Sequence, residues 1–353
     1  MIFALYLENM EECDQKQIQL FIEKITSHDK NYSEIFGSMK TIKVLIGKQP
    51  SLYQKLITNE RNEVLNTANK MVSDYFIEHE KLVSVEEIVV LLQFLHNMCV
   101  GQQDFCNEMW SRMEGLFIKL LNIDGEVKLK NVLAAIILQL LKHNCAPLNN
   151  TELMVNILKG VLNTIMVDDS IHFPLIVIQE LIRNQPEFSF DLAYEHLNLQ
   201  QKLILLDIIA EEKIEKMPVQ LVKFLASTFK KQSAILMTVM KQESDTNPSE
   251  TIRILKLIGT FSHSNEFIHV LQSDKSLVID AVYLLRMVHD SGKSNPNHMF
   301  SVVKNMTEVS NIEKMESDPV FGFKRDLIRL IGNLCHENRE NQDQVCLSTD
   351  CWL

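Results

Sequence analysis

Glycine and proline are scarce in this sequence, whose 353 residues include 10 Gly and 8 Pro. A β-sandwich or a loop-rich enzyme of this length would need more turn-forming residues. Long apolar runs are lacking too: the longest run after the N-terminus, VLAAIIL at 132–138, is far too short for a membrane-spanning helix. Apolar residues nevertheless make up 46% of the chain, which argues against wholesale disorder. These features favour a folded protein of long helices and short turns, without membrane insertion.

The seven cysteines are odd in number and include no C-x-x-C pair. A disulfide framework or zinc knuckle is therefore not expected, and a reducing compartment fits best. The start, MIFALYLENMEECD, has no basic lead-in and no small-residue cleavage site, so it does not read as a secretion signal. The formal net charge of -11 disfavours nucleic acid as a partner. We predict a cytosolic protein.

The motifs of common enzymes are absent as well. There is no Walker A loop, dinucleotide-binding glycine motif, nucleophile elbow, zinc-protease motif or kinase catalytic loop. His263 and His269 lie off one helical face and lack a third ligand nearby, which disfavours a metal site. Cys99 and Cys335 occupy matching positions; redox thiols are one interpretation, and buried small hydrophobes are the favoured one. We therefore expect no enzyme activity, no cofactor and no metal.

Helix-forming segments recur at intervals of about 40 residues, the period of armadillo and HEAT repeats. Each has apolar residues at helical spacing and ends in a short polar turn. The segments are 85–105, 132–145, 172–188, 201–214, 251–267, 279–292 and 322–345. Asn-Pro pairs in polar stretches predict linkers at 241–250 and 290–298. The sequence predicts an all-α, right-handed α-solenoid of about seven or eight irregular armadillo/HEAT-like repeats.

Three of these segments match in more than hydrophobicity. They are LQFLHNMC (92–99), ILKLIGTFSH (254–263) and LIRLIGNLCH (327–336). They superpose on Asn97, Thr260 and Asn333, and the last two share a glycine, at Gly259 and Gly332. A glycine inside a helix costs about 1 kcal/mol relative to alanine. Its repeated use predicts that helices cross closely at these positions.

A polar stripe follows the matched helices. In the last one, Asp326, Arg329, Asn333 and His336 fall on one helical face. The last helix of an armadillo repeat lines the concave surface, where amide side chains can hold the backbone of an extended partner. The alternative is a solvated helix face, with asparagine ending the helix through local bonds. The predicted protein-binding residues are Asn97, Arg253, Lys256, Arg329, Asn333 and His336.

Two stretches carry a resemblance to a known family. GFKRDLIRLIGNLCHENRENQDQV (322–345) closely resembles the C-terminal motif of the ataxin-10 family, and LLQFLHNMCVGQQDFCNEMW (91–110) is similar to an earlier armadillo helix of that family. The resemblance implies a cytosolic, non-enzymatic, armadillo-like protein linked to neuronal survival, neurite outgrowth and cytokinesis. It also implies a C-terminal region that self-associates. A scaffold that binds other proteins is the favoured function; the alternative is an adaptor that regulates a G protein or another enzyme, for example by nucleotide exchange.

The resemblance breaks off after Val345. In the family the motif continues through a Gly-Ile-Pro-type turn into further helices, whereas this sequence continues as CLSTDCWL. We interpret 1–305 as irregular armadillo-like repeats and 306–353 as the start of the family's C-terminal region, shortened after residue 345. Missing partner helices would expose apolar side chains such as Leu330, Leu334 or Val345, so a homo-oligomer is also expected.

Overall fold

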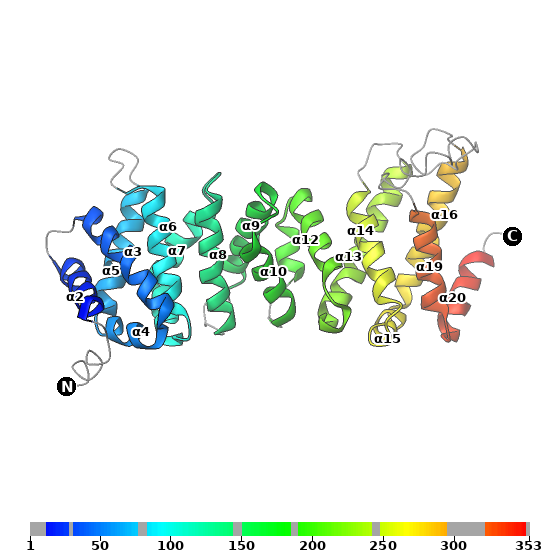
Figure 1. Cartoon of the computed structure of the whole chain (residues 1–353). Coiled ribbons are helices and arrows are strands. Elements are labelled where there is room, and N and C mark those ends of the chain that lie inside the picture. The colour runs from blue at the N-terminus through cyan, green and yellow to red at the C-terminus, as the bar shows by residue number, and fades with distance from the viewer. Residues whose placement is uncertain are drawn as a thin grey trace, which may run out of the picture. The chain divides into compact units, whose positions relative to one another are not determined.

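A computed structural model describes residues 12–27, 31–76, 83–143, 150–184, 190–241, 248–294 and 322–350. Within these ranges every regular element is a helix, which confirms the predicted all-α class (Figure 1). None of the described helices is both long and apolar enough to cross a membrane. The chain forms two compact units, unit 1 (Met1–Ala193) and unit 2 (Tyr194–Leu353), and each is described separately.

Unit 1 contains nine helices among its described residues before the short α11 (Phe190–Glu195), which spans the boundary between the units. They are α2 (Glu12–Thr26), α3 (Tyr32–Lys48), α4 (Pro50–Thr58), α5 (Arg61–Tyr75), α6 (Val85–Cys99), α7 (Gln103–Leu121), α8 (Val127–Lys142), α9 (Thr151–Val167) and α10 (His172–Asn184). The described part of unit 2 contains α12 (Leu199–Glu211), the 3-10 helix η2 (Ile214–Lys216), α13 (Val219–Lys241), α14 (Ser249–Phe261), α15 (Ile268–Gln272), α16 (Lys275–Ser294), α19 (Phe323–Cys335) and α20 (Arg339–Asp350).

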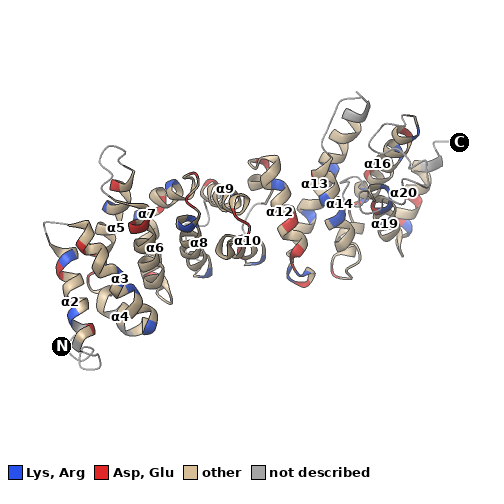
Figure 2. Ribbon diagram, turned by 45° about the horizontal axis from the view of Figure 1, so that its top comes forward, with Lys and Arg blue, Asp and Glu red and all other residues tan. Residues whose placement is uncertain are grey.

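The helices of each unit stack in two rows, which we call row A and row B. In unit 1, row A is α3, α6, α8 and α10, and row B is α2, α5, α7 and α9. In unit 2, row A is α12, α14 and α19, and row B is α13, α16 and α20. Each helix packs on the next one in its row, and all except α12 also pack closely on a helix of the facing row, as Figure 2 shows within each unit. Short helices, α4, η2 and α15, lead from a row A helix to the next row B helix. This order defines an armadillo-like helical repeat.

Row A helices are buried on several sides, as their apolar circumference predicts. In α6, Leu91, Leu92, Phe94 and Leu95 are fully buried between α3, α8 and row B. Each such side chain contributes roughly 1.5–3 kcal/mol when removed from water. The helix begins at Ser84, whose hydroxyl accepts from the Glu87 amide while the Glu87 carboxylate accepts from the Ser84 amide. This capping box satisfies two backbone donors that the first turn leaves free.

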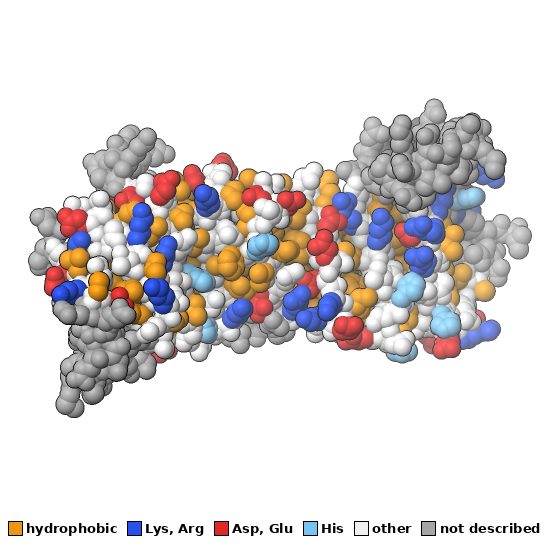
Figure 3. Space-filling view, viewed as in Figure 1, with side chains coloured by type: hydrophobic (Ala, Val, Ile, Leu, Met, Phe, Trp, Pro, Cys, Tyr) orange, Lys and Arg blue, Asp and Glu red, His pale blue; other side chains and the backbone are white. Residues whose placement is uncertain are grey.

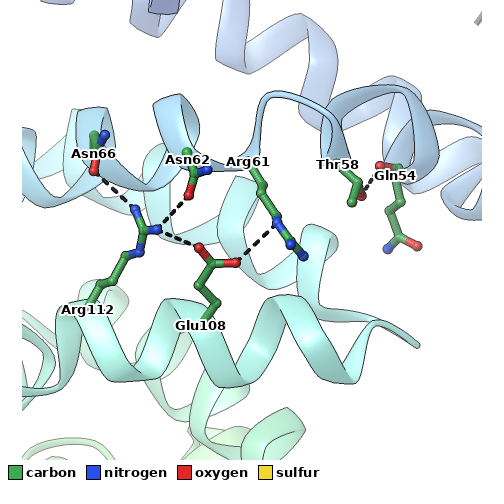
Figure 4. Close-up of polar contacts among 7 residues, drawn as sticks. All are labelled: Gln54, Thr58, Arg61, Asn62, Asn66, Glu108 and Arg112. Carbon is green, nitrogen blue, oxygen red and sulfur yellow. Dashed lines mark hydrogen bonds and ion pairs between the residues drawn. The ribbon is translucent and has the colours of Figure 1, made fainter.

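The row B surface of unit 1 carries a charged network between α5 and α7 (Figure 4). The Arg112 guanidinium on α7 donates to Glu108 at 2.6 Å, and it also reaches the side-chain oxygens of Asn62 and Asn66 on α5 at 2.6 and 3.1 Å. Arg61 on α5 lies 3.2 Å from the other Glu108 oxygen. Because these groups are partly exposed, each pair adds only about 0–1 kcal/mol, and their main effect is to fix the register of α5 on α7.

The predicted linkers are shorter than expected where the structure describes them. Helix α16 continues to Ser294, so the prediction of a linker from residue 290 is wrong for 290–294. Local bonds explain the extension: Arg286 pairs with Asp290, and the Ser294 hydroxyl donates to the Asp290 carbonyl. The rest of that linker, and residues 242–247 of the other, lie outside the described residues. The predicted domain boundary at 305/306 also lies outside them and stays a prediction.

The two matched glycines do not mark close helix crossings, so that prediction is wrong. A Cβ atom built on Gly259 or Gly332 would meet no atom within 4 Å. The close crossing lies instead at Gly160 on α9, where a Cβ would stand 2.3 Å from Leu121 Cγ on α7. Gly332 is exposed, and Gly259, although buried, has no side chain or neighbouring helix at its Cβ position.

The prediction that apolar residues of the last helix would be exposed is also wrong. Leu330 and Leu334 are fully buried, and Val345 is half-buried. The residues after Asn338 form α20, which packs on α16 and α19 and thereby helps to cover the face that we expected to be open. The apolar side chains exposed in this region are instead Ile328, at 59%, and Leu347, at 63%.

Candidate functional site

Asn97 joins two neighbouring row A helices of unit 1. Its Nδ2 donates to the Lys43 carbonyl on α3 at 3.1 Å. The carbonyls of Asn97 and Val100, at the end of α6, both accept from Gln54 Nε2 on α4, at 2.5 and 2.9 Å. Gln54 is only 1% exposed, so this amide takes the place of water at the end of α6.

Unit 2 repeats this arrangement. Gln272 Nε2, at the end of α15, donates to the carbonyls of Asn333 and His336 at 3.3 and 2.8 Å. Asn333 Nδ2 donates to Ser262 Oγ at 2.8 Å, just beyond the end of α14. We call each set an Asn–Gln clasp: Gln54, Asn97 and Val100 in unit 1, and Gln272, Asn333 and His336 in unit 2.

The backbone after each clasp follows the same path. Val100 has φ -59° and ψ 111°, and His336 has φ -62° and ψ 122°. The next residues, Gly101 and Glu337, both have positive φ, 72° and 52°. A row B helix, α7 or α20, then begins. The sequence match between the two segments thus reflects one structural unit used twice, and its clasp glutamines were missed by sequence reasoning.

The two predicted asparagines, Asn97 and Asn333, use their side chains for hydrogen bonds inside the protein. Both amide NH2 groups donate to the preceding row A helix or to the turn that ends it, so a partner protein would meet them through Oδ1. In Asn97 that Oδ1 also lies 3.3 Å from His96 Nδ1. Burial lowers the pKa of His96, against the opposing effect of its hydrogen bond to Asn97. The His96 ring is therefore neutral near pH 7 and adds no charge beside the clasp.

The other predicted residues gather on row A of unit 2. A groove of about 460 Å³ runs between α14 and α19, with Lys256, Gly259 and Thr260 on one wall and Arg325, Asp326 and Arg329 on the other. A second depression of about 370 Å³ lies between α12 and α14 and shares Ile214, Lys256 and Thr260 with the first. Figure 3 shows Lys and Arg side chains over α14 and α19 on this face.

Some of the charged side chains on this face have ion-pair partners and others do not. Arg253 pairs with Asp207 on α12 at 2.7 Å, and Arg325 pairs with the buried Asp326 at 3.1 Å. Lys256 and Arg329 are exposed, and neither forms an ion pair within the described residues. The His336 side chain is 77% exposed, 3.9 Å from Glu337. The groove thus presents two cations whose charge nothing nearby in the described structure neutralises.

Groups suited to catalysis or metal binding do not gather at this face. Across the described ranges, no three His, Cys, Asp or Glu side chains are placed to hold a metal ion. His263 follows α14, and its Nδ1 lies 2.7 Å from the Gly259 carbonyl in the last turn of that helix. Cys99 is buried as expected, with Sγ 3.7 Å from Met109 Sδ. Burial, with a smaller effect of Cys346, raises the pKa of the half-buried Cys335 and disfavours its reactive thiolate.

The two rows, the short connecting helices and the repeated clasp define an armadillo-like repeat protein with a polar groove on row A. Comparison with known proteins identifies the family. The chain is 30% identical over 272 residues to ataxin-10 of Homo sapiens and of Pongo abelii, and 27% identical over 266 residues to that of Bos taurus. The chain belongs to the ataxin-10 family.

The match to these relatives is partial in length. It covers 72% of this chain and 54% of each of the three relatives, so the chain spans about half the length of the curated relatives it matches. No family model and no solved structure matches the chain.

Proposed function

We propose that this chain is a non-enzymatic scaffold that binds other proteins in the cytosol through row A of unit 2. The observation that carries the proposal is the α14–α19 groove, in which Lys256 and Arg329 are exposed and without ion-pair partners among the described residues. Two unneutralised cations suit recognition of a charged partner. Because they lie on helices, whose backbone is already ordered, binding has a small entropic cost.

The clasp supports the rigidity of this face. Gln272 and Asn333 tie the end of α19 to α14 and α15, so the groove wall is held by hydrogen bonds as well as by apolar packing. Membership of the ataxin-10 family extends the proposal to cellular processes: neuronal survival, neurite outgrowth and cytokinesis are the ones in which we expect the scaffold to act.

Site-specific cross-linking tests the proposal. A photoreactive amino acid replaces Thr260, in the groove, or Lys293, an exposed residue of α16 on row B. Proteins cross-linked in cytosol are identified, expressed and tested for binding to the purified chain. We expect partners that cross-link from Thr260 only and bind with a measurable Kd. Partners that cross-link only from Lys293 would place binding on the wrong row, and a purified partner that fails to bind would refute the scaffold function.

The adaptor alternative is distinguished in the same experiment. If a partner is a GTPase, its rate of nucleotide release is measured with and without the chain. An unchanged rate agrees with a passive scaffold, whereas an accelerated rate would replace it with an exchange adaptor.

Self-association remains a second part of the proposal. The exposed Ile328 and Leu347 offer apolar surface near the C-terminal end of the described chain. We expect the mass measured by sedimentation to rise with concentration and Ile328→Lys to oppose the rise. A monomer at a protein concentration on the order of tens of micromolar would contradict this part, because even weak self-association produces detectable oligomers at that concentration.

A further inference from the structure

We propose that the α14–α19 groove binds an extended acidic peptide segment, whose carboxylates form ion pairs with Lys256 and Arg329. This inference rests on the proposed scaffold function and names the chemistry of the partner.

Charge complementarity argues for an acidic occupant. The groove is lined by Lys256, Arg325 and Arg329 against a single carboxylate, Asp326. Asp326 is 9% exposed and already paired with Arg325, so its charge is neutralised inside the protein. The excess positive charge is local, because the whole chain carries a formal net charge of -11. A long polyanion such as nucleic acid would be repelled by the rest of the surface, whereas a short acidic segment would not.

The shape of the groove argues for an extended chain. Gly259 lines the groove and is itself buried, and outside its own stretch of helix backbone no atom lies within 4 Å of the position that a Cβ would occupy. A peptide that lies in the groove would therefore meet no side chain of residue 259 on the α14 wall. The groove also continues past Lys256 and Thr260 into the depression between α12 and α14, which suits a segment several residues long. That depression adds two carboxylates: Asp207, which is paired with Arg253, and the buried Glu212. The positive excess that would attract an acidic segment thus lies at the α14–α19 end, at Lys256 and Arg329.

Hydrogen-bonding groups for a peptide backbone are present beside the cations. The Thr260 hydroxyl donates to the Lys256 carbonyl at 2.9 Å and keeps its acceptor capacity. Asn333 uses its NH2 group within the clasp, which leaves Oδ1 to accept from a peptide amide. Cations for carboxylates and acceptors for backbone amides thus meet on one face of unit 2.

Selection from a random peptide display library on the full chain tests the inference. We expect the enriched peptides to be rich in Asp and Glu, and the doubly substituted Lys256→Glu, Arg329→Glu chain to lose this preference. The matched control is Lys223→Glu with Lys293→Glu, two exposed lysines of row B that change the net charge by the same amount. This control should keep the preference for acidic peptides.

Binding of one selected acidic peptide is then measured by fluorescence anisotropy. We expect Lys256→Ala with Arg329→Ala to weaken binding by about tenfold or more, and added salt to weaken it further. Gly259→Leu fills the groove and leaves its charges in place, so it should also abolish binding. Thermal unfolding of each variant confirms that it is folded.

Enrichment of neutral or basic peptides, no enrichment at all, or an acidic preference that survives the Lys256 and Arg329 substitutions would overturn the inference. None of these results would refute the scaffold proposal, because that proposal is tested separately by cross-linking from Thr260 to a folded partner.

Discussion

The replacement Gln54→Met tests whether the Asn–Gln clasp stabilises the fold. Methionine keeps the length of the side chain and removes its amide. The substitution deletes two hydrogen bonds, from Gln54 Nε2 to the carbonyls of Asn97 at 2.5 Å and Val100 at 2.9 Å. It also removes the Oε1 acceptor that Gln102 uses at 3.2 Å.

Burial sets the size of the effect. A net hydrogen bond contributes about 0.5–1.5 kcal/mol, and a buried polar group left without a partner costs about 1–3 kcal/mol. Since Gln54 is 1% exposed, water cannot readily replace it, and we expect Gln54→Met to lower the free energy of unfolding by about 2–4 kcal/mol. Gln272 is partly exposed, so hydration can replace its bonds to Asn333 and His336. Gln272→Met should therefore cost only about 1–2 kcal/mol.

The assay is urea unfolding followed by circular dichroism, together with hydrogen exchange of the α6 and α19 segments. Exchange is needed because the two units need not unfold in one transition. Gln220→Met, at an exposed position of α13, is the control and should change stability by less than about 0.5 kcal/mol. If Gln54→Met is as mild as this control, or if Gln272→Met costs more than Gln54→Met, the clasp does not stabilise the fold as argued.

Three further substitutions have defined outcomes. Gly160→Ala should destabilise unit 1 by about 1–3 kcal/mol in urea unfolding, because the alanine methyl group would overlap Leu121. The same substitution should cost less in a Leu121→Ala background. An equal cost in both backgrounds would show that the overlap is not the cause. Glu337→Gly should raise stability by about 1 kcal/mol in thermal unfolding, since φ is 52° there, and a loss of stability would show that the conformation is not strained. Burial raises the pKa of Asp274, but hydrogen bonds, one from Lys230 at 2.6 Å, outweigh it and hold the pKa below its usual 3.8. The lowered pKa stabilises the protein above about pH 4, and this stabilisation is lost as pH falls through the folded-state pKa. Asp274→Asn should therefore be less stable than the parent at pH 7, and the difference should shrink as pH is lowered below about 4; a pH-independent difference would contradict this.

The helices were predictable because their sequence pattern is local. The predicted segment at 85–105 corresponds to α6 and the start of α7, and the one at 322–345 to α19 and most of α20. Apolar residues at helical spacing specify a helix and its buried face without reference to the rest of the chain. The match on Asn97 and Asn333 was equally informative, since the two residues occupy the same structural position.

The clasp glutamines could not be found in the same way. Gln54 lies 43 residues before Asn97, whereas Gln272 lies 61 residues before Asn333. No fixed spacing therefore links either glutamine to its asparagine. The pairing depends on how α4 and α15 fold back onto the ends of row A helices, which is tertiary information.

The glycines and the C-terminal leucines show the same limit. Gly259, Gly332 and Gly160 each lie within a helix, yet only Gly160 faces a close neighbour, and sequence spacing does not reveal which helix passes by. Leu330 and Leu334 were expected to be exposed because the family motif is interrupted. The segment after Asn338, although polar, forms α20 and helps to cover them.

The clasp of unit 2 has a consequence for how this part of the sequence can evolve. Helix α19 is held by Gln272 on α15 and by Ser262 after α14, both of which precede Ser294. The end of this helix is thus held by side chains that lie 61 and 71 residues earlier in the sequence. Gln272 binds backbone carbonyls, which any residue can supply, whereas Ser262 binds the Asn333 side chain. Ser262 and Asn333 are therefore expected to change together among relatives of this protein, while Gln272 can keep its bonds whichever side chains it faces.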